Sequence, residues 1–202
     1  MADRVRPAVA TLLSLLLLAG CGGEPEARFN GSVLENPFTV PDIDLTDTGG
    51  KPFSLAADTD KRLTLLFFGY TNCPDICLTV MQSLASAMTR LDEQDREQVD
   101  VVFVTTDPAR DTAPVLRRWL DGYDPSFIGL TGELETIIEV GDPLAVYVSS
   151  GEKLPSGGYD LGGHTTQITA IDGGDQAPVY WSEATSSAEY ASDIHTLLAQ
   201  ED

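Results

Sequence analysis

Short apolar runs along the chain alternate with stretches in which apolar residues recur at a helical period. Residues 62–68 (RLTLLFF) form a nearly continuous apolar run, as expected of a strand buried on both faces of a sheet. From Cys77 to Leu91, apolar residues recur at i, i+3, i+4 and i+7, which predicts an amphipathic helix of about four turns. This succession of buried strand and amphipathic helix indicates an α/β fold.

The same pattern predicts further elements on both sides of this pair. They are strands over 101–104, 127–130, 145–148, 164–171 and 179–181, helices over 113–120, after Thr131 and after Ser186, and a hairpin of residues 38–45 and 52–55. Strand and helix thus alternate until a second hairpin and a terminal helix close the chain. That order predicts one α/β domain, a thioredoxin-like sandwich with a central mixed sheet flanked by helices and an N-terminal β-hairpin.

The first residues have the pattern of an export signal. Arg4 and Arg6 precede an apolar stretch over 12–19, which is too short to span a bilayer. The sequence Leu18-Ala19-Gly20-Cys21 resembles the lipobox of bacterial lipoproteins, in which the cysteine is lipidated and becomes the new N-terminus. The alternative is an ordinary secretion signal with a chance cysteine.

These features predict how the chain is divided and where it works. We expect a lipoprotein signal peptide over 1–20, lipidation of Cys21, a polar tether over 21–34 and a folded domain over 35–202. The domain would be lipid-anchored at the extracytoplasmic face of a bacterial cell membrane. Disulfides can persist in that compartment, so each cysteine of the domain requires an explanation.

The charge of the chain narrows the choice of partner. Its 202 residues include 12 Lys plus Arg and 32 Asp plus Glu, for a net charge of -20. A phosphate backbone would repel such a chain, so nucleic acid is excluded as a partner. The acidity suits either a saline environment or a basic partner. With 3 Cys in all, the chain has no disulfide scaffold and depends on its apolar core.

The candidate chemistry begins where the first buried strand runs into the first helix. Cys73 and Cys77 lie at this point, and Pro74 keeps Cys73 out of helical geometry while Cys77 enters the helix. The N-terminus of a helix lowers the pKa of a nearby thiol, which favours the thiolate as a nucleophile or a metal ligand. The spacing is one residue longer than in a thioredoxin-like redox pair, so a staple, a redox pair and a metal site all remain open.

His164 is the third candidate, because it begins a predicted strand directly after the Gly-rich loop 149–163. Two thiolates and one imidazole suit Cu(I) in a three-coordinate site, and with a further oxygen or water ligand they suit Cu(II). Zinc would normally require a fourth protein ligand. The alternative is a histidine with a purely structural role.

Three ordered motifs extend this interpretation. Residues 68–77 (FGYTNCPDIC) resemble the signature of the Sco/SenC family, copper-handling assembly proteins with a thioredoxin-like fold. Residues 107–112 (DPARDT) are similar to that family's DPxRDT segment, and residues 164–166 (HTT) occupy the place of its metal-ligand histidine. The resemblance covers roughly residues 35–199, nearly the whole exported domain.

The resemblance implies a function and a ligand set. Cys73, Cys77 and His164 would hold one copper ion, and the chain would assist assembly of the copper centre of cytochrome c oxidase subunit II or of another exported copper protein. It would act as a monomer and chiefly as a metallochaperone, with thiol–disulfide oxidoreductase activity left open. Two residues depart from the family pattern, Leu78 where a proline is common and Gln167 where an aromatic residue is more frequent.

Two other functions fit the same residues. In an exported thiol–disulfide reductase, Cys73 would attack the target, Cys77 would resolve the intermediate and His164 would be a bystander. In a plain interaction domain, Cys73 and Cys77 would form a stable structural disulfide.

Several charged residues near the motifs have simpler interpretations. Asp75 is expected to cap the first helix, with tuning of the site as its alternative role. Asp107 either supports the site or a docked partner, or forms a local turn. Arg110 and Asp111 are expected to form a local ion pair, and His195 to interact with the end of the last helix or with solvent.

Overall fold

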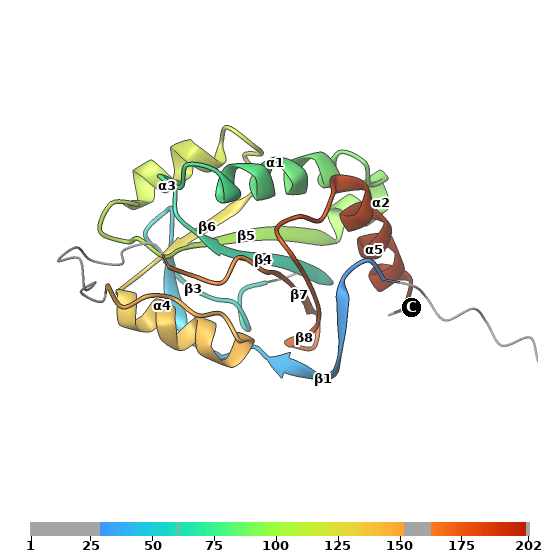
Figure 1. The fold of residues 1–202 in the computed structure, drawn as a ribbon, viewed down its shortest axis with the longest axis horizontal. Helices are drawn as coiled ribbons and strands as arrows, with labels where there is room; N and C mark the ends of the chain where they lie inside the picture. The colour runs from blue at the N-terminus through green and yellow to red at the C-terminus, as the bar shows by residue number, and fades with distance from the viewer. Residues whose placement is uncertain (1–28, 60, 152–162, 201–202) are drawn as a thin grey trace, which may run out of the picture.

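An 8-stranded mixed sheet runs through the part of the chain described by the computed structural model, residues 29–59, 61–151 and 163–200 (Figure 1). The strands are β1 (Ser32–Thr39), β2 (Asp44–Asp47), β3 (Pro52–Ser54), β4 (Leu63–Gly69), β5 (Val99–Thr105), β6 (Ile128–Thr131), β7 (Ile168–Asp172) and β8 (Gln176–Trp181). They lie in the order β1-β8-β7-β4-β5-β6-β2-β3. β4, β5 and β6 are parallel, and all other neighbours are antiparallel.

Helices cover both faces of this sheet. They are α1 (Ile76–Met88), α2 (Glu93–Glu97), α3 (Ala113–Leu120), α4 (Leu134–Gly141), α5 (Ser187–Gln200) and the 3-10 turn η1 (Asp142–Leu144). α1, α3 and α5 lie over one face, and α4 lies over the other (Figure 1). This arrangement confirms the predicted thioredoxin-like sandwich.

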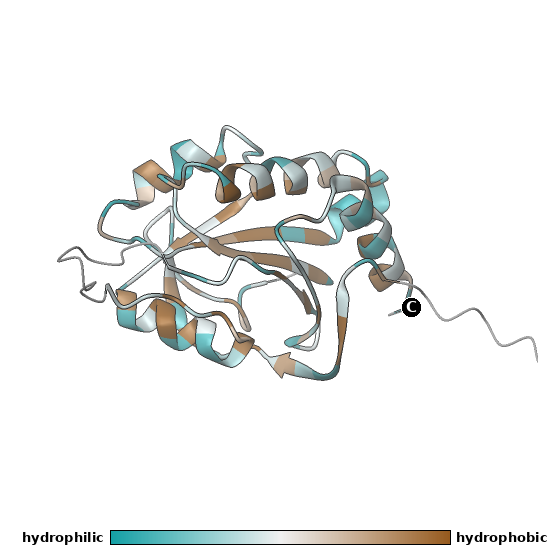
Figure 2. Ribbon diagram, viewed as in Figure 1, coloured by the Kyte–Doolittle hydropathy of each residue, from teal (hydrophilic) through white to brown (hydrophobic). Residues whose placement is uncertain are grey.

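The central strand β4 supplies both cores because its side chains alternate between the two faces. Leu65 and Phe67 pack with α1, α3 and α5, whereas Leu66 and Phe68 pack with α4. The central strands β4 and β5 are accordingly mostly hydrophobic, while the helices are two-toned (Figure 2). All of β4 is buried, which confirms the prediction made from its apolar run.

The N-terminal hairpin is confirmed as β2 and β3, but the first predicted strand is divided. Residues 38–39 end β1, which pairs with β8 at one edge of the sheet, and the chain then crosses to β2 near the other edge. Pro41 explains the break, because proline has no N–H for a strand ladder. Residues 32–34, assigned to the tether from the sequence, form the start of β1.

The strand predicted over 145–148 does not form. Ala145 adopts a left-handed conformation at φ 55 directly after η1, so the chain turns where the strand was expected. Only Val148 makes a β-bridge, and its partner is His164. Val146 and Val148 are still buried in the core beneath α4, so the apolar pattern reflects burial rather than strand pairing. The following strand, predicted from residue 164, begins only at Ile168.

The predicted signal peptide over 1–20, Cys21 and the start of the tether lie outside the described residues, as do residues 152–162 of the Gly-rich loop. None of the described helices combines the length and the apolar character needed to span a bilayer.

Candidate metal centre

The two cysteines lie at the carboxyl edge of the parallel strands. β4 ends at Gly69, α1 begins at Ile76, and the loop between them carries Cys73. We call residues 70–75 the cysteine loop. Its turn is closed by the backbone N–H of Cys73, which donates to the carbonyl oxygen of Tyr70 at 3.2 Å. At the same edge, the N–H of Thr106 after β5 donates to the carbonyl oxygen of Gly69 at 2.6 Å. The edge predicted from strand order is therefore where the cysteines lie.

Cys73 is the accessible member of the pair. Partial burial acts to raise its pKa, but backbone N–H groups of Asp75 and Cys77 and the side chain of Tyr70 bring the pKa below the ordinary thiol value. One of these contacts runs from the N–H of Cys77 to the Cys73 sulfur at 3.5 Å. The start of α1 thus favours the Cys73 thiolate, as the sequence predicted.

Cys77 has the opposite environment. Its side chain is 0% exposed, and burial raises the pKa of its thiol to about 12. A side chain at position 69 would place its Cβ 3.0 Å from both the Cys77 sulfur and Cε2 of Phe103, so only glycine allows this close packing. The prediction of a lowered thiol pKa is therefore wrong for Cys77, because helix position counts for less than burial. Both cysteines are free thiols in this structure.

His164 reaches the same edge from the other side of β4. Its ring lies edge-on to Phe67, at 6.4 Å between centroids, and to Tyr70, at 5.9 Å. Nδ1 lies 2.9 Å from the carbonyl oxygen of Thr165, which can only accept a hydrogen bond. Burial lowers the pKa of His164 below its usual value. A neutral ring with the proton on Nδ1 leaves the Nε2 lone pair available to a metal.

Tyr70 contacts both parts of this candidate site. Its side chain hydrogen-bonds Cys73 while its ring meets His164, and burial followed by the nearby Cys73 charge raises its own pKa. Within the described ranges, no group of three or more His, Cys, Asp and Glu is close enough to hold a metal ion. Cys73, Cys77 and His164 thus share one edge of the sheet but do not form a closed three-ligand site in this structure.

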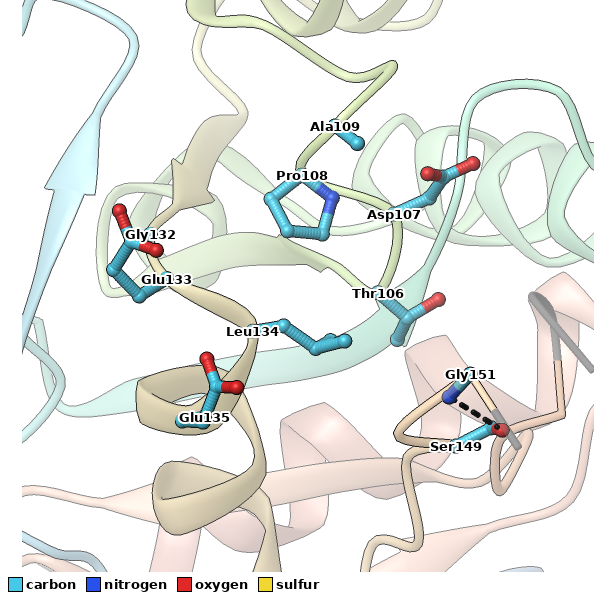
Figure 3. Close-up of a pocket in the computed structure, with 10 residues that line it drawn as sticks. All are labelled: Thr106, Asp107, Pro108, Ala109, Gly132, Glu133, Leu134, Glu135, Ser149 and Gly151. Atoms are coloured by element: carbon cyan, nitrogen blue, oxygen red, sulfur yellow. Dashed lines mark hydrogen bonds between the residues drawn. The ribbon is translucent and has the colours of Figure 1, made fainter. Parts of the chain in front are cut away.

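Asp75 meets its expectation only in part, whereas Asp107 forms the local turn that was one of its two expected roles, with its carbonyl oxygen accepting from the N–H of Arg110 at 3.1 Å. Asp75 occupies the N-cap position of α1, as expected. Its side chain, however, makes no capping hydrogen bond. Asp107 pairs with Arg110 and lines a cavity of 410 Å³ (Figure 3). The cavity lies between the loop after β5, the start of α4 and the segment at Ser149, whose N–H donates to the carbonyl oxygen of Gly163.

The expected ion pair between Arg110 and Asp111 is wrong. Arg110 binds Asp107, while Asp111 is 1% exposed and turns toward the cysteine loop, where it accepts hydrogen bonds from Thr71. Sequence reasoning missed Asp111 and Tyr70 as parts of the site. Tyr70 stands inside the quoted motif and could have been singled out there, whereas no local signal pairs Asp111 with Thr71.

The arrangement supports two kinds of chemistry. A thiol with a lowered pKa, a second thiol beside it and a neutral imidazole form a soft donor set, which is suited to copper. The same two thiols could also exchange with a disulfide, with Cys73 as the attacking group.

Comparisons with known proteins agree on one family. The family model described as SCO1/SenC matches residues 32–199. The solution structure of apo Sco1 from Thermus thermophilus is 33% identical, with a TM-score of 0.72, and the match covers 85% of this chain and 98% of that one. The crystal structure of Arabidopsis thaliana ScoI with copper bound is 26% identical, with a TM-score of 0.70, covering 80% and 99% of the two chains.

Curated relatives extend the similarity beyond solved structures. A SCO2-like protein of Rickettsia felis is 37% identical over 152 residues, which are 69% of this chain and 72% of the relative. The mitochondrial protein SCO2 of Saccharomyces cerevisiae is 37% identical over 131 residues, 63% of this chain and 42% of the relative. The chain thus spans about half the length or less of several curated relatives that it matches.

Proposed function

Because the chain belongs to the SCO1/SenC family, we propose that it is a copper chaperone that holds one copper ion through Cys73, Cys77 and His164. The observation that carries the proposal is the placement of a thiolate-prone Cys73 and a neutral His164 at one sheet edge, both in contact with Tyr70. Copper bound in the related Arabidopsis protein supports the choice of metal. Two sulfur donors and one imidazole suit Cu(I), and an added oxygen or water ligand would suit Cu(II).

Closing the site requires the three ligands to approach one another. No group of three ligands is close enough to hold a metal ion among the described residues, so Cys73, Cys77 and His164 must move closer together when copper binds. His164 is oriented for ligation because the carbonyl oxygen of Thr165 engages Nδ1 and leaves Nε2 available. Cys77 must lose its proton on binding, and its raised pKa makes copper affinity increase with pH.

The proposed acceptor is an exported copper protein, with subunit II of cytochrome c oxidase as the leading candidate. One solved protein of this fold, BsSco, is described as a member of the Sco family of cytochrome c oxidase assembly proteins. The motif over residues 68–77 supports the same role for this chain. We propose that the monomer delivers copper to this acceptor at the extracytoplasmic face of a bacterial membrane.

The proposed anchor is a lipid on Cys21. The lipobox-like sequence before this residue and the polar residues after it support this assignment. Cys21→Ser should release the chain from the membrane fraction of an expressing bacterium and abolish incorporation of a labelled fatty acid. Membrane retention of the variant would contradict the lipid anchor while leaving copper binding untouched.

A competitive Cu(I) titration of the reduced chain tests the ligand set. We expect one tightly held copper per chain, with affinity reduced about tenfold or more in His164→Ala. His195→Ala is the matched control, because His195 contacts Asp95 rather than the cysteine loop. Equally weak copper binding by the unsubstituted chain and by His164→Ala would overturn the chaperone proposal.

The asymmetry of the two cysteines favours a second candidate, a thiol–disulfide reductase. The Cys73 thiolate would attack a target disulfide to form a mixed disulfide, and Cys77 would then attack the Cys73 sulfur and release the reduced target. The chain would leave this cycle with a Cys73–Cys77 disulfide, which an exported dithiol must reduce. Reductase activity that survives His164→Ala, together with a mixed disulfide trapped by Cys77→Ser, would favour this candidate.

A further inference from the structure

Asp111 is a buried carboxylate that faces the cysteine loop. Its side chain is 1% exposed, yet it belongs to the loop after β5, in the sequence 107–112. It accepts a hydrogen bond from the backbone N–H of Thr71 at 2.8 Å and from the Thr71 hydroxyl at 2.5 Å. The hydroxyl of Thr105 donates a third hydrogen bond at 2.7 Å. The carboxylate therefore accepts three hydrogen bonds, two from the cysteine loop and one from the end of β5.

A carboxylate is costly to bury unless donors replace its water, and three donors do so here. Thr71 follows Tyr70 directly and precedes Cys73 by two residues. The position of the Thr71 backbone therefore constrains the Cα positions of Tyr70 and Cys73. The two bonds from Thr71 fix its backbone N–H and its side chain to the same acceptor. The cysteine loop is thus attached to the loop after β5 as well as being closed by its own turn.

Further hydrogen bonds fix the loop that carries Asp111. The N–H of Asp111 donates to the carbonyl oxygen of Asp107 at 2.9 Å, and the N–H of Asp107 donates to the Thr105 hydroxyl at 3.0 Å. Thr106 also binds the last residue of β4 through its backbone N–H. The loop that carries Asp111 is therefore itself fixed to the ends of β4 and β5.

We propose that Asp111 is a positioning residue, whose carboxylate holds Thr71 so that Tyr70 and Cys73 remain aligned with His164. It would act on copper or on a disulfide only through the cysteine loop, since its hydrogen bonds go to Thr71 and Thr105. The inference about copper rests on the proposed function. The inference about the loop does not, because the dithiol–disulfide equilibrium of Cys73 and Cys77 needs no metal.

The experiment compares Asp111→Asn with Asp193→Asn. Asp193 is a matched control, since it is 0% exposed and its carboxylate accepts from Gly31, Asn30 and the Trp181 indole, all outside the cysteine loop. Three quantities are measured for each chain: the unfolding midpoint in denaturant, the Cu(I) affinity, and the equilibrium of Cys73 and Cys77 with dithiothreitol. In that exchange the disulfide is reduced to two thiols as dithiothreitol is oxidised to its cyclic disulfide.

We expect both variants to lower the unfolding midpoint, but only Asp111→Asn to change the site. Its Cu(I) affinity should fall about tenfold or more, and its dithiol equilibrium constant should shift several-fold. Unchanged copper affinity and an unchanged dithiol equilibrium in Asp111→Asn, despite a lowered midpoint, would reduce Asp111 to a structural residue and overturn the proposal. Equal effects of the two variants on the site would overturn it as well.

Substitutions of Thr71 keep the test valid where Asp111→Asn fails to fold. Thr71→Val removes the hydroxyl donor and should reproduce the change in the dithiol equilibrium in part, whereas Thr71→Ser retains the donor and should restore it. Equal equilibria in the two variants would contradict the proposal. If the unsubstituted chain binds no copper, the proposed function fails, and the dithiol equilibrium still decides the role of Asp111.

Discussion

Tyr70 contacts both Cys73 and His164, although no spacing in the sequence places it between them. At the scale of single residues, such contacts decide the chemistry of the site. Cys73 and Cys77 belong to one motif, but hydrogen bonds lower the pKa of the first against the effect of burial, whereas burial raises the pKa of the second. The pair is therefore asymmetric. Cys73 forms a thiolate more readily than an ordinary thiol, and Cys77 less readily.

Removing the Tyr70 hydroxyl should raise the pKa of Cys73. In Tyr70→Phe the thiolate loses one of the hydrogen bonds that favour its charged form, while the ring that faces His164 is kept. The measurement is the ultraviolet absorbance of the thiolate as a function of pH in the reduced protein. Tyr180→Phe serves as the control, since Tyr180 lies on β8, outside the cysteine loop. A Cys73 pKa that is unchanged or lower in Tyr70→Phe would contradict this role.

Gly69→Ala should destabilise the protein. The added Cβ would lie 3.0 Å from the Cys77 sulfur and 3.1 Å from Cε1 of Phe67, which is closer than a packed core tolerates. Overpacking costs about 1–3 kcal/mol, which exceeds the gain of about 0.4–1 kcal/mol from a less flexible unfolded chain. Denaturant unfolding of the reduced protein measures the difference. Gly173→Ala is the control, because the nearest atom there lies 4.0 Å away, and equal effects of the two variants would contradict the packing argument.

Some contacts between helices of this fold cannot be predicted from the sequence of either helix. The acidic stretch after α1 forms the short helix α2, which Asp92 caps by accepting the N–H of Asp95. Asp95 in turn binds Nδ1 of His195 on α5 at 2.7 Å, where only the helix end or solvent was expected as a partner. Likewise α4 begins at Leu134 rather than after Thr131, because Thr131 is the last residue of β6.

The contact between α2 and α5 should make stability depend on pH. The hydrogen bond and the charge of Asp95 raise the pKa of His195 above 6.5, so the folded state binds the proton more tightly than the unfolded state. The contribution is complete below the unfolded pKa and is lost as pH rises through the raised folded pKa. It should not exceed about 1 kcal/mol, because an exposed pair is screened by solvent.

The measurement is the unfolding free energy of the unsubstituted chain minus that of His195→Gln, followed from acidic to alkaline pH. Using the difference removes the opposite effect of His164, whose burial lowers its pKa. A difference that stays constant with pH, or grows on the alkaline side, would contradict a protonated His195 in the pair.

The whole molecule carries a net charge of -20, which results from the excess of Asp and Glu over Lys and Arg along the chain. Like charges repel one another across the folded surface, and this repulsion weakens in the expanded unfolded chain. The cost falls when salt screens charges that lie more than about 10 Å apart at 0.1 M ionic strength. The acidity is thus a property of the entire surface, to be tested on the intact protein.

Raising the ionic strength should therefore stabilise the folded protein. We expect the thermal unfolding midpoint to increase with sodium chloride and to level off once the surface charges are screened. Potassium chloride at the same ionic strength should have the same effect, because screening depends on charge rather than on ion identity. A midpoint that stays flat or falls would mean that self-repulsion is not a significant cost. Slower association with a basic partner at high salt would separately support electrostatic steering.

Elements whose signals are local can be read from the order of residues alone. The apolar run of β4, the helical period of α1 and the motif over residues 68–77 follow from neighbouring side chains, so the fold class and the cysteine pair could be predicted. The absence of a strand over 145–148 is a consequence of the folded chain, because the chain turns after η1 and this direction overrides the apolar pattern. The tertiary structure alone brought Asp111 to Thr71, which lies 40 residues away, since such contacts form when separate strand ends meet at one edge of a sheet.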